Sequence, residues 1–133
     1  MTKLPIAAIY GRARAVGNEF LSSCDMRFAT KRNTLLGQPE VGLGPVPGAG
    51  RSQYLSRLIG CGRATEYILS ANDIGAEEAE KIEWINKVFD TEKEMLEHVE
   101  ALVSCIAHFL HGAIGAAKES INTASQPSMT DLK

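Results

Sequence analysis

The chain has 133 residues, of which 44% are hydrophobic and 23% charged, and its formal net charge is −2. These values are typical of a single globular domain that is large enough to bury its own core. They exclude the strongly basic surface of a nucleic-acid-binding protein, and no apolar run is long enough to span a bilayer.

The cysteines and histidines predict neither a disulfide nor a metal site. Cys24, Cys61 and Cys105 are widely spaced and include no Cys-x-x-Cys pair, so we expect reduced, buried thiols in an intracellular protein. His108 and His111 have no acidic partner on their predicted helix face. The first residues are not a secretory signal. We therefore expect a cytoplasmic protein and leave a mitochondrial or peroxisomal location open.

Short strands and turns are predicted for the first part of the chain. The expected elements are a strand over 4–10, a loop over 11–17, a helix over 19–24, and strands over 26–30 and 33–36. Asn18 is placed to cap the helix. The first strand is continuously apolar, as in strands that are covered on both faces. Because a small protein rarely opens on such a strand, we expect a shortened form of a larger architecture.

Helices dominate the second part. The expected elements are a loop over 42–50, helices over 51–59, 63–69 and 73–81, a strand over 84–89, and helices over 91–112 and 113–124. Thr91 and Glu94 form a capping box, which marks the clearest helix start in the chain. The apolar stripe from Leu96 to Leu110 predicts either a core face or an oligomer face. The fold class is therefore α/β, with helices at the C-terminal end.

Two glutamates in glycine-dense settings follow predicted strands. Glu19 comes shortly after Gly17, and Glu40 directly follows Pro39. A strand end can aim an acid or base into a cleft while the backbone stays fixed, and the N–H groups at a helix start can stabilise an oxyanion. The pair therefore indicates an enzyme that could add water across a double bond. The alternative is that Glu19 is a surface residue favoured by the helix dipole and that Glu40 belongs to a turn.

Other charged and glycine-rich features have simpler interpretations. Arg12 and Arg14 lie beside the predicted site, where they are expected to pair with a neighbouring subunit or, alternatively, to steer an anionic substrate. Asp25 is expected to be a structural acid. The glycines at 42–44 and 48–50 do not complete a nucleotide-binding motif, so we expect no nucleotide phosphate site.

Several motifs in a fixed order carry a resemblance to a known family. They are Pro5–Ala13, Gly17–Phe20, Cys24–Ala29, Gly37–Gly44, Pro47–Gly50, Ala76–Glu80, Trp84–Val88 and Ala116–Asn122. Over nearly the whole chain the sequence resembles the crotonase superfamily, the enoyl-CoA hydratases and isomerases. The resemblance implies a crotonase-like ββα spiral, of which residues 1–90 form the C-terminal portion. It also implies that residues 91–133 form a helical segment that builds a homo-oligomer, a trimer or hexamer.

The resemblance implies roles for individual residues as well. Glu19 and Glu40 resemble the two catalytic glutamates that hold and activate water. Val16 resembles the residue whose backbone N–H forms half of an oxyanion hole, with Gly17 beside it. The residues expected to line the substrate pocket are Pro47, Gly48 and Arg51. The implied substrate is an acyl-CoA or a related small molecule, with coenzyme A as part of the substrate and with no further cofactor and no metal.

Three departures from the family pattern leave the function open. Ala15 and Val16 stand where the family usually has glycine, and Arg51 stands where a second glycine is common. The N-terminal portion, which ordinarily supplies the other oxyanion N–H and most contacts to the CoA nucleotide, is expected to be missing. The open functions are a hydratase or isomerase of α,β-unsaturated acyl thioesters, a non-catalytic binding or assembly subunit, and an enzyme of specialised metabolism that acts on a non-CoA substrate.

Overall fold

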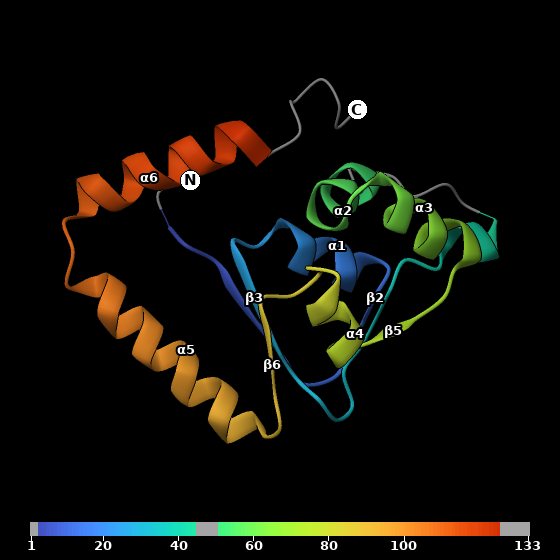
Figure 1. The fold of residues 1–133 in the computed structure, drawn as a ribbon, viewed down its shortest axis with the longest axis horizontal. Coiled ribbons are helices and arrows are strands. Elements are labelled where there is room, and N and C mark those ends of the chain that lie inside the picture. The colour runs from blue at the N-terminus through green and yellow to red at the C-terminus, as the bar shows by residue number, and fades with distance from the viewer. Residues whose placement is uncertain (1–2, 45–50, 126–133) are drawn as a thin grey trace.

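The computed structural model describes residues 3–44 and 51–125, and its strands form two small sheets (Figure 1). The strands are β1 (Ile6–Ile9), β2 (Arg12–Arg14), β3 (Met26–Thr30), β4 (Leu35–Gly37), β5 (Ile74–Gly75) and β6 (Lys87–Phe89). One sheet has the order β1-β3-β6 and is parallel throughout. The other has the order β2-β4-β5, with β2 parallel and β5 antiparallel to β4.

The helices follow or separate these strands along the chain. They are α1 (Val16–Ser23), the 3-10 helix η1 (Glu40–Leu43), α2 (Arg51–Ile59), α3 (Cys61–Ser70), α4 (Ala76–Lys81), α5 (Glu92–Ala107) and α6 (His111–Ser125). The segment β1-β2-α1 is repeated by β3-β4 and the helices after it, and each turn adds one parallel strand to each sheet. The chain therefore winds as a spiral of strand–strand–helix units, and the predicted α/β fold with helices at the C-terminal end is confirmed.

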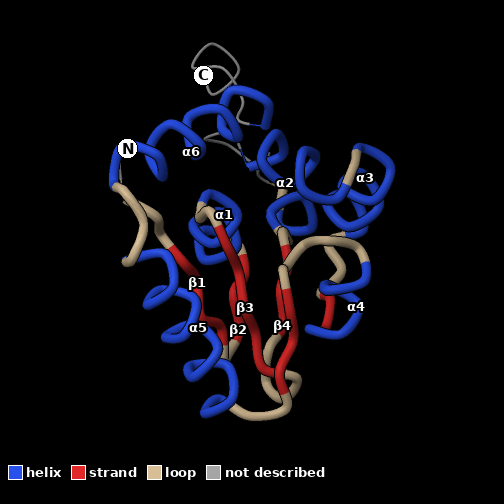
Figure 2. The backbone as a smooth tube through the Cα atoms, turned by 60° about the vertical axis from the view of Figure 1, so that its left-hand side comes forward, coloured by secondary structure: helices blue, strands red, loops and turns tan. Residues whose placement is uncertain are grey.

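The core lies between the sheets and the helices α1, α2 and α3. Ala29 of β3, Leu36 of β4 and Leu55 of α2 are completely buried, and so is Trp84, which precedes β6. Figures 1 and 2 show α2 and α3 side by side above the strands, on the same side of the molecule as α1. This core fixes the strand ends at which the candidate site lies.

The two C-terminal helices lie outside this core. Helix α5 packs against the β1-β3-β6 sheet through Met95, while α6 lies across the end of the molecule (Figures 1 and 2). In the apolar stripe, Leu96, Val103 and Leu110 are 40, 47 and 80% exposed, so the prediction of a core face is wrong for these residues. The prediction of an oligomer face remains.

No single helix within residues 3–44 and 51–125 is both long and apolar enough to cross a membrane. Helices α5 and α6 together pass the same test of length and composition, but their axes are bent by 114° at the break between them.

Several predicted elements differ from the structure at their ends. The predicted loop over 11–17 contains β2, a strand that exists because it pairs with β4. Helix α1 begins at Val16 with Ala15 at its cap position, so Asn18 lies within the first turn, and its side chain is buried inside the protein. The predicted loop over 42–50 begins with the last residues of η1, and residues 45–50 lie outside the described part of the chain.

The prediction of a strand buried on both faces is wrong. In the described part of the chain β1 has a strand neighbour on one side only, so most of it is half-buried. The predicted strand from Trp84 starts only at Lys87. Gly112 does not end a helix: α5 already ends at Ala107, and Gly112 lies in α6. The capping box is confirmed, because Thr91 and Glu94 each bond the backbone N–H of the other.

Two of the three cysteines are also not buried. Cys24 is buried at the end of α1, whereas Cys61 and Cys105 are exposed on α3 and α5. All three are free thiols. Spacing along the sequence predicted the absence of disulfides correctly, but it carried no information on which helix faces the thiols occupy.

Candidate active site

The first part of the candidate site is the N-terminus of α1. Ala15, with φ at 52°, turns the chain sharply out of β2, and its N–H donates to the carbonyl of Gly37 at 3.1 Å. Val16 and Gly17 then open the helix and are exposed. Because a helix supplies no carbonyl partner to its first N–H groups, those of Val16 and Gly17 are available to an oxygen atom outside the helix. The N–H of Glu19 is the first to bond back, to Ala15 at 3.0 Å.

Each candidate glutamate lies next to a strand end. Glu19 is half-buried in the first turn of α1. Glu40 opens η1, three residues after β4 ends at Gly37, and is only 7% exposed. Its Oε1 accepts a hydrogen bond of 2.7 Å from Gln38 Nε2. The carboxylate is therefore held in place within the protein and is not a mobile surface group.

Buried hydrogen bonds join the two segments that carry the glutamates. Asn18 Nδ2 donates to Gln38 Oε1 at 2.7 Å, and Trp84 Nε1 donates to Asn18 Oδ1 at 2.9 Å. Asn18 precedes Glu19 directly, and Gln38 bonds Glu40. The structure therefore places the start of α1 and the end of β4 side by side.

An open groove runs along the edges of β1 and β2 beside the start of α1. It has a volume of about 500 Å³, and its lining includes Tyr10, Arg12, Gly17 and Phe20. Gly17 thus brings the free end of the helix to the groove, where a ligand could approach the backbone closely. Neither Glu19 nor Glu40 lines it.

The residues predicted to line the substrate pocket are largely outside the described part of the chain, whereas the partner of Arg14 is resolved. Pro47 and Gly48 lie outside the described residues, as does the side chain of Arg51, whose backbone begins α2. Arg14 pairs with Asp73 of the same chain at 2.9 Å, so it does not depend on a neighbouring subunit for its partner. A side chain at Gly37 would collide with the Asp73 carboxylate, and glycine there therefore leaves room for this ion pair.

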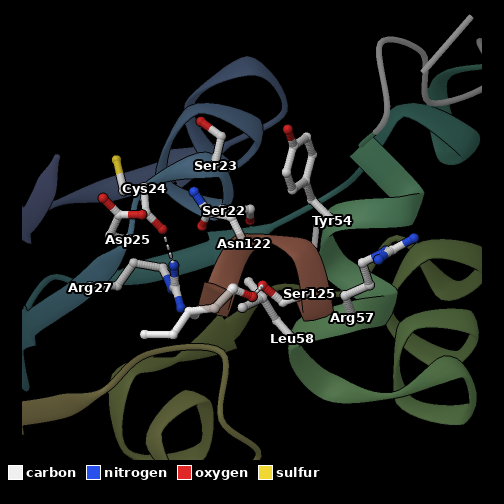
Figure 3. A pocket seen from close by; sticks show the side chains of 11 residues that line it. Ser22, Ser23, Cys24, Asp25, Arg27, Tyr54, Arg57, Leu58, Asn122 and Ser125 are labelled. Atoms are coloured by element: carbon white, nitrogen blue, oxygen red, sulfur yellow. Dashed lines mark hydrogen bonds between the residues drawn. The ribbon is translucent and has the colours of Figure 1, made fainter. Parts of the chain in front are cut away.

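A smaller cavity of about 120 Å³ lies behind α1, among Ser22, Cys24, Arg27 and side chains of α2 and α6 (Figure 3). The buried Arg27 guanidinium donates to the carbonyls of Cys24 at 2.7 Å and Trp84 at 2.8 Å. Burial lowers the pKa of Arg27 and raises the pKa of the Cys24 thiol, which Arg27 lowers in part. Arg27 therefore has a structural role, because its side chain donates to backbone carbonyls at the end of α1 and before β6.

The described residues contain no group of three or more His, Cys, Asp or Glu side chains that could hold a metal ion. The chemistry available at the candidate site is that of carboxylates, amides and backbone N–H groups.

Sequence reasoning missed three residues that shape the site, namely Asn18, Gln38 and Trp84. Asn18 and Gln38 lie within the motifs of the glutamates, and an amide one or two residues before each candidate acid was a signal that could have been used. Trp84 carries the only indole of the chain. A buried indole N–H requires an acceptor, which was the available signal there.

Comparisons with known proteins agree with this fold. A family model described as enoyl-CoA hydratase/isomerase matches residues 1–132. The chain is 40% identical over 126 residues to a short-chain-enoyl-CoA hydratase of Clostridium acetobutylicum, covering 95% of this chain and 48% of that protein. It has the same identity and coverage with a crotonyl-CoA hydratase of Syntrophomonas wolfei. The chain therefore spans about half the length of these curated relatives.

Solved structures also match nearly the whole chain. A protein of Streptomyces avermitilis assigned as an enoyl-CoA hydratase superposes with a TM-score of 0.95 at 43% identity, covering 99% of this chain and 47% of that one. A Thermobifida fusca protein with the same assignment, solved in complex with CoA, gives a TM-score of 0.87 at 30% identity, covering 98% of this chain and 50% of that one.

Proposed function

The chain belongs to the enoyl-CoA hydratase/isomerase family and has its crotonase fold, and we propose that it adds water to an α,β-unsaturated acyl thioester or isomerises a related enolisable carbonyl compound. The observation that carries the proposal is the placement of Glu40. Its carboxylate is 7% exposed and is hydrogen-bonded by Gln38, which also binds the residue next to Glu19. Two acids in the helical turns that follow the adjacent strands β2 and β4 are suited to proton transfer.

In the proposed reaction the two glutamates position one water molecule. One carboxylate accepts a proton from the water as its oxygen bonds to the β-carbon, and the electron pair of the double bond moves toward the thioester carbonyl. The α-carbon then takes up a proton from the other acid. Glu19 and Glu40 share these roles, and acid–base assistance of this kind contributes about 10²–10⁴-fold to a rate.

The start of α1 serves the developing enolate. The Val16 N–H donates to the thioester oxygen, and Gly17 beside it leaves room for the thioester to approach the backbone. The positive end of the helix dipole favours the same negative charge. Replacement of glycine by Val16 keeps the N–H, because only the side chain differs. Acyl-CoA is the proposed substrate class, supported by the hydratase names of the relatives and by the CoA complex of the Thermobifida fusca protein.

A second candidate function is a binding or assembly subunit without turnover. One observation favours it. The groove along β1 is rimmed by Tyr10 and Phe20, which are 58 and 70% exposed. In this case the chain would bind another polypeptide there and would leave catalysis to its partner.

One experiment separates these functions. Purified protein is tested for hydration of crotonyl-CoA by the loss of enoyl absorbance, and for binding of CoA by calorimetry. The proposal expects both hydration and binding, whereas a well-folded protein that neither hydrates crotonyl-CoA nor binds CoA contradicts it and favours the assembly subunit. Glu66→Gln removes an exposed carboxylate of α3 and is the control for the variants Glu19→Gln and Glu40→Gln.

A further inference from the structure

A continuous chain of side-chain hydrogen bonds runs from Trp84 to Glu40, and we call it the buried relay. Trp84 Nε1 donates to Asn18 Oδ1 at 2.9 Å, Asn18 Nδ2 to Gln38 Oε1 at 2.7 Å, and Gln38 Nε2 to Glu40 Oε1 at 2.7 Å. Trp84, Asn18 and Gln38 are 0% exposed, and Glu40 is 7% exposed. The relay therefore crosses the core from the segment before β6 to the candidate site.

The two ends of the relay determine the direction of every bond in it, because one end only donates and the other only accepts. An indole N–H can only donate, so Asn18 must turn its oxygen toward Trp84 and its NH₂ toward Gln38. Gln38 must then turn its oxygen toward Asn18 and its NH₂ toward Glu40. An ionised Glu40 carboxylate can only accept, so it requires the same orientation of Gln38 from the other end of the relay. Without Trp84, Asn18 could rotate by half a turn, and the carboxylate alone would orient Gln38. Trp84 thus reinforces the orientation in which Gln38 donates to Glu40.

Trp84 itself is firmly held. The backbone N–H of Trp84 donates to the carbonyl of Ala79 at 2.9 Å, and the backbone carbonyl of Trp84 accepts from Arg27 Nε at 2.8 Å. Arg27 is one of the buried residues of the cavity in Figure 3, where it also binds Cys24. The ring of Tyr67 lies edge-on to the indole, with centroids 5.7 Å apart. An indole clamped at its backbone and its ring can act as a fixed reference for the amides.

We propose that Trp84 and Asn18 are positioning residues of the site, which act through Gln38 to hold the Glu40 carboxylate in its reactive orientation. The inference rests on the proposed role of Glu40 as an acid or base. It assigns a function in the reaction to two residues that are completely buried.

The first test reads the relay without any assay of activity. Trp84 is the only tryptophan, so ¹⁵N-labelled protein gives a single indole N–H signal in an NMR spectrum. Glu40→Leu removes the acceptor at the far end, and we expect the indole signal to move although Glu40 is three hydrogen bonds away. Glu66→Leu is the control, because Glu66 neighbours Tyr67 and would report a disturbance transmitted by packing. An indole signal that moves no more in Glu40→Leu than in the control overturns the proposal.

The second test measures hydration of crotonyl-CoA. Trp84→Phe keeps an aromatic ring but removes the donor, and we expect kcat to fall about tenfold while KM changes by less than about twofold. Tyr67→Leu disturbs the packing of the indole and leaves the three hydrogen bonds in place, so its kcat is expected to stay within about twofold of wild type. Unchanged kcat in Trp84→Phe, or equal losses in both variants, overturns the proposal.

Two further outcomes are distinguishable. If Trp84→Phe does not fold, Asn18→Leu cuts the relay one bond nearer to Glu40, and its kcat is expected to fall in the same way. If the wild-type protein does not hydrate crotonyl-CoA, the proposed function fails, while the NMR test still decides whether Trp84 is coupled to Glu40.

Discussion

Lys118 of α6 forms an ion pair of 2.7 Å with Asp25, the residue before β3, and only 7% of the lysine is exposed. Its Nζ also donates to the carbonyl of Lys3. Lys118 is the one buried residue among those of α6. The buried charge of Lys118 therefore connects α6 to the start of β3. Asp25 forms this ion pair and so has the structural role that the sequence predicts.

Replacement of Lys118 by alanine should release α6. The Asp25 carboxylate would lose its cation while remaining largely covered, which costs up to about 3 kcal/mol, the low end for a buried pair because Asp25 is partly exposed. Hydrogen exchange of the α6 amides should accelerate. Lys93→Ala removes an exposed lysine whose partner Glu97 is 3.9 Å away, and it should leave exchange in α6 unchanged. Equal exchange in wild type and Lys118→Ala would contradict this role.

Asn18→Ala should destabilise the whole protein. The substitution leaves the indole N–H of Trp84 and the side-chain oxygen of Gln38 buried without these partners, and each such group costs about 1–3 kcal/mol. Chemical denaturation should therefore show a lower free energy of unfolding. Asn72→Ala, at an exposed position, is the matched control and should change it by no more than about 0.5 kcal/mol. A stability equal to that of the control would mean that the buried bonds are not formed in solution.

The three cysteines should react at very different rates with iodoacetamide. The thiolate is the reactive form, and burial both covers Cys24 and raises its pKa, so less thiolate is present at a given pH. Cys61 and Cys105 are exposed and should be labelled first. Mass spectrometry of the native protein at pH 8 should therefore show two fast additions and one slow one. Labelling of Cys24 as fast as Cys61 would show that this end of α1 opens readily.

The 133-residue chain should self-associate. Tyr10, Val16 and Phe20 are 58, 64 and 70% exposed near β1 and β2, each of which has a strand on only one side in the described part of the chain. Light scattering should show a mass that rises with concentration, and Phe20→Gln should reduce the rise. Leu69→Gln, at an equally exposed apolar position of α3, should not. A stable monomer over a wide concentration range would contradict this prediction.

Patterns of neighbouring residues correctly predicted several elements of the fold. The bounds of β3 and α2 agree with the expectation at every residue, and the capping box at Thr91 starts α5. Contacts between distant segments decided the rest. Strand β2 exists through its pairing with β4, and the apolar run before β6 becomes a strand only at Lys87, where it meets β3. Neither pairing is written in the spacing of nearby residues.

The candidate site was predictable to a similar extent. Glu19 and Glu40 could be chosen because glycines and predicted strands surround them. The hydrogen-bond partner of Glu40 could not be predicted. Gln38 bonds Asn18, and Asn18 bonds Trp84, which is 66 residues away along the chain. Asparagine is a favoured cap residue, which predicts a helix start at Asn18. Helix α1 instead begins at Val16, and the Asn18 side chain is buried within its first turn.

The most direct measurement is the rate of crotonyl-CoA hydration by the wild-type protein and by Glu19→Gln and Glu40→Gln. Each variant keeps the size of the side chain and removes its ability to exchange a proton at neutral pH. We expect kcat to fall by about 10²-fold or more in each variant while the melting temperature stays close to that of wild type. Hydration that continues at the wild-type rate in either variant would contradict the assignment of the two glutamates as the acid and base of this site.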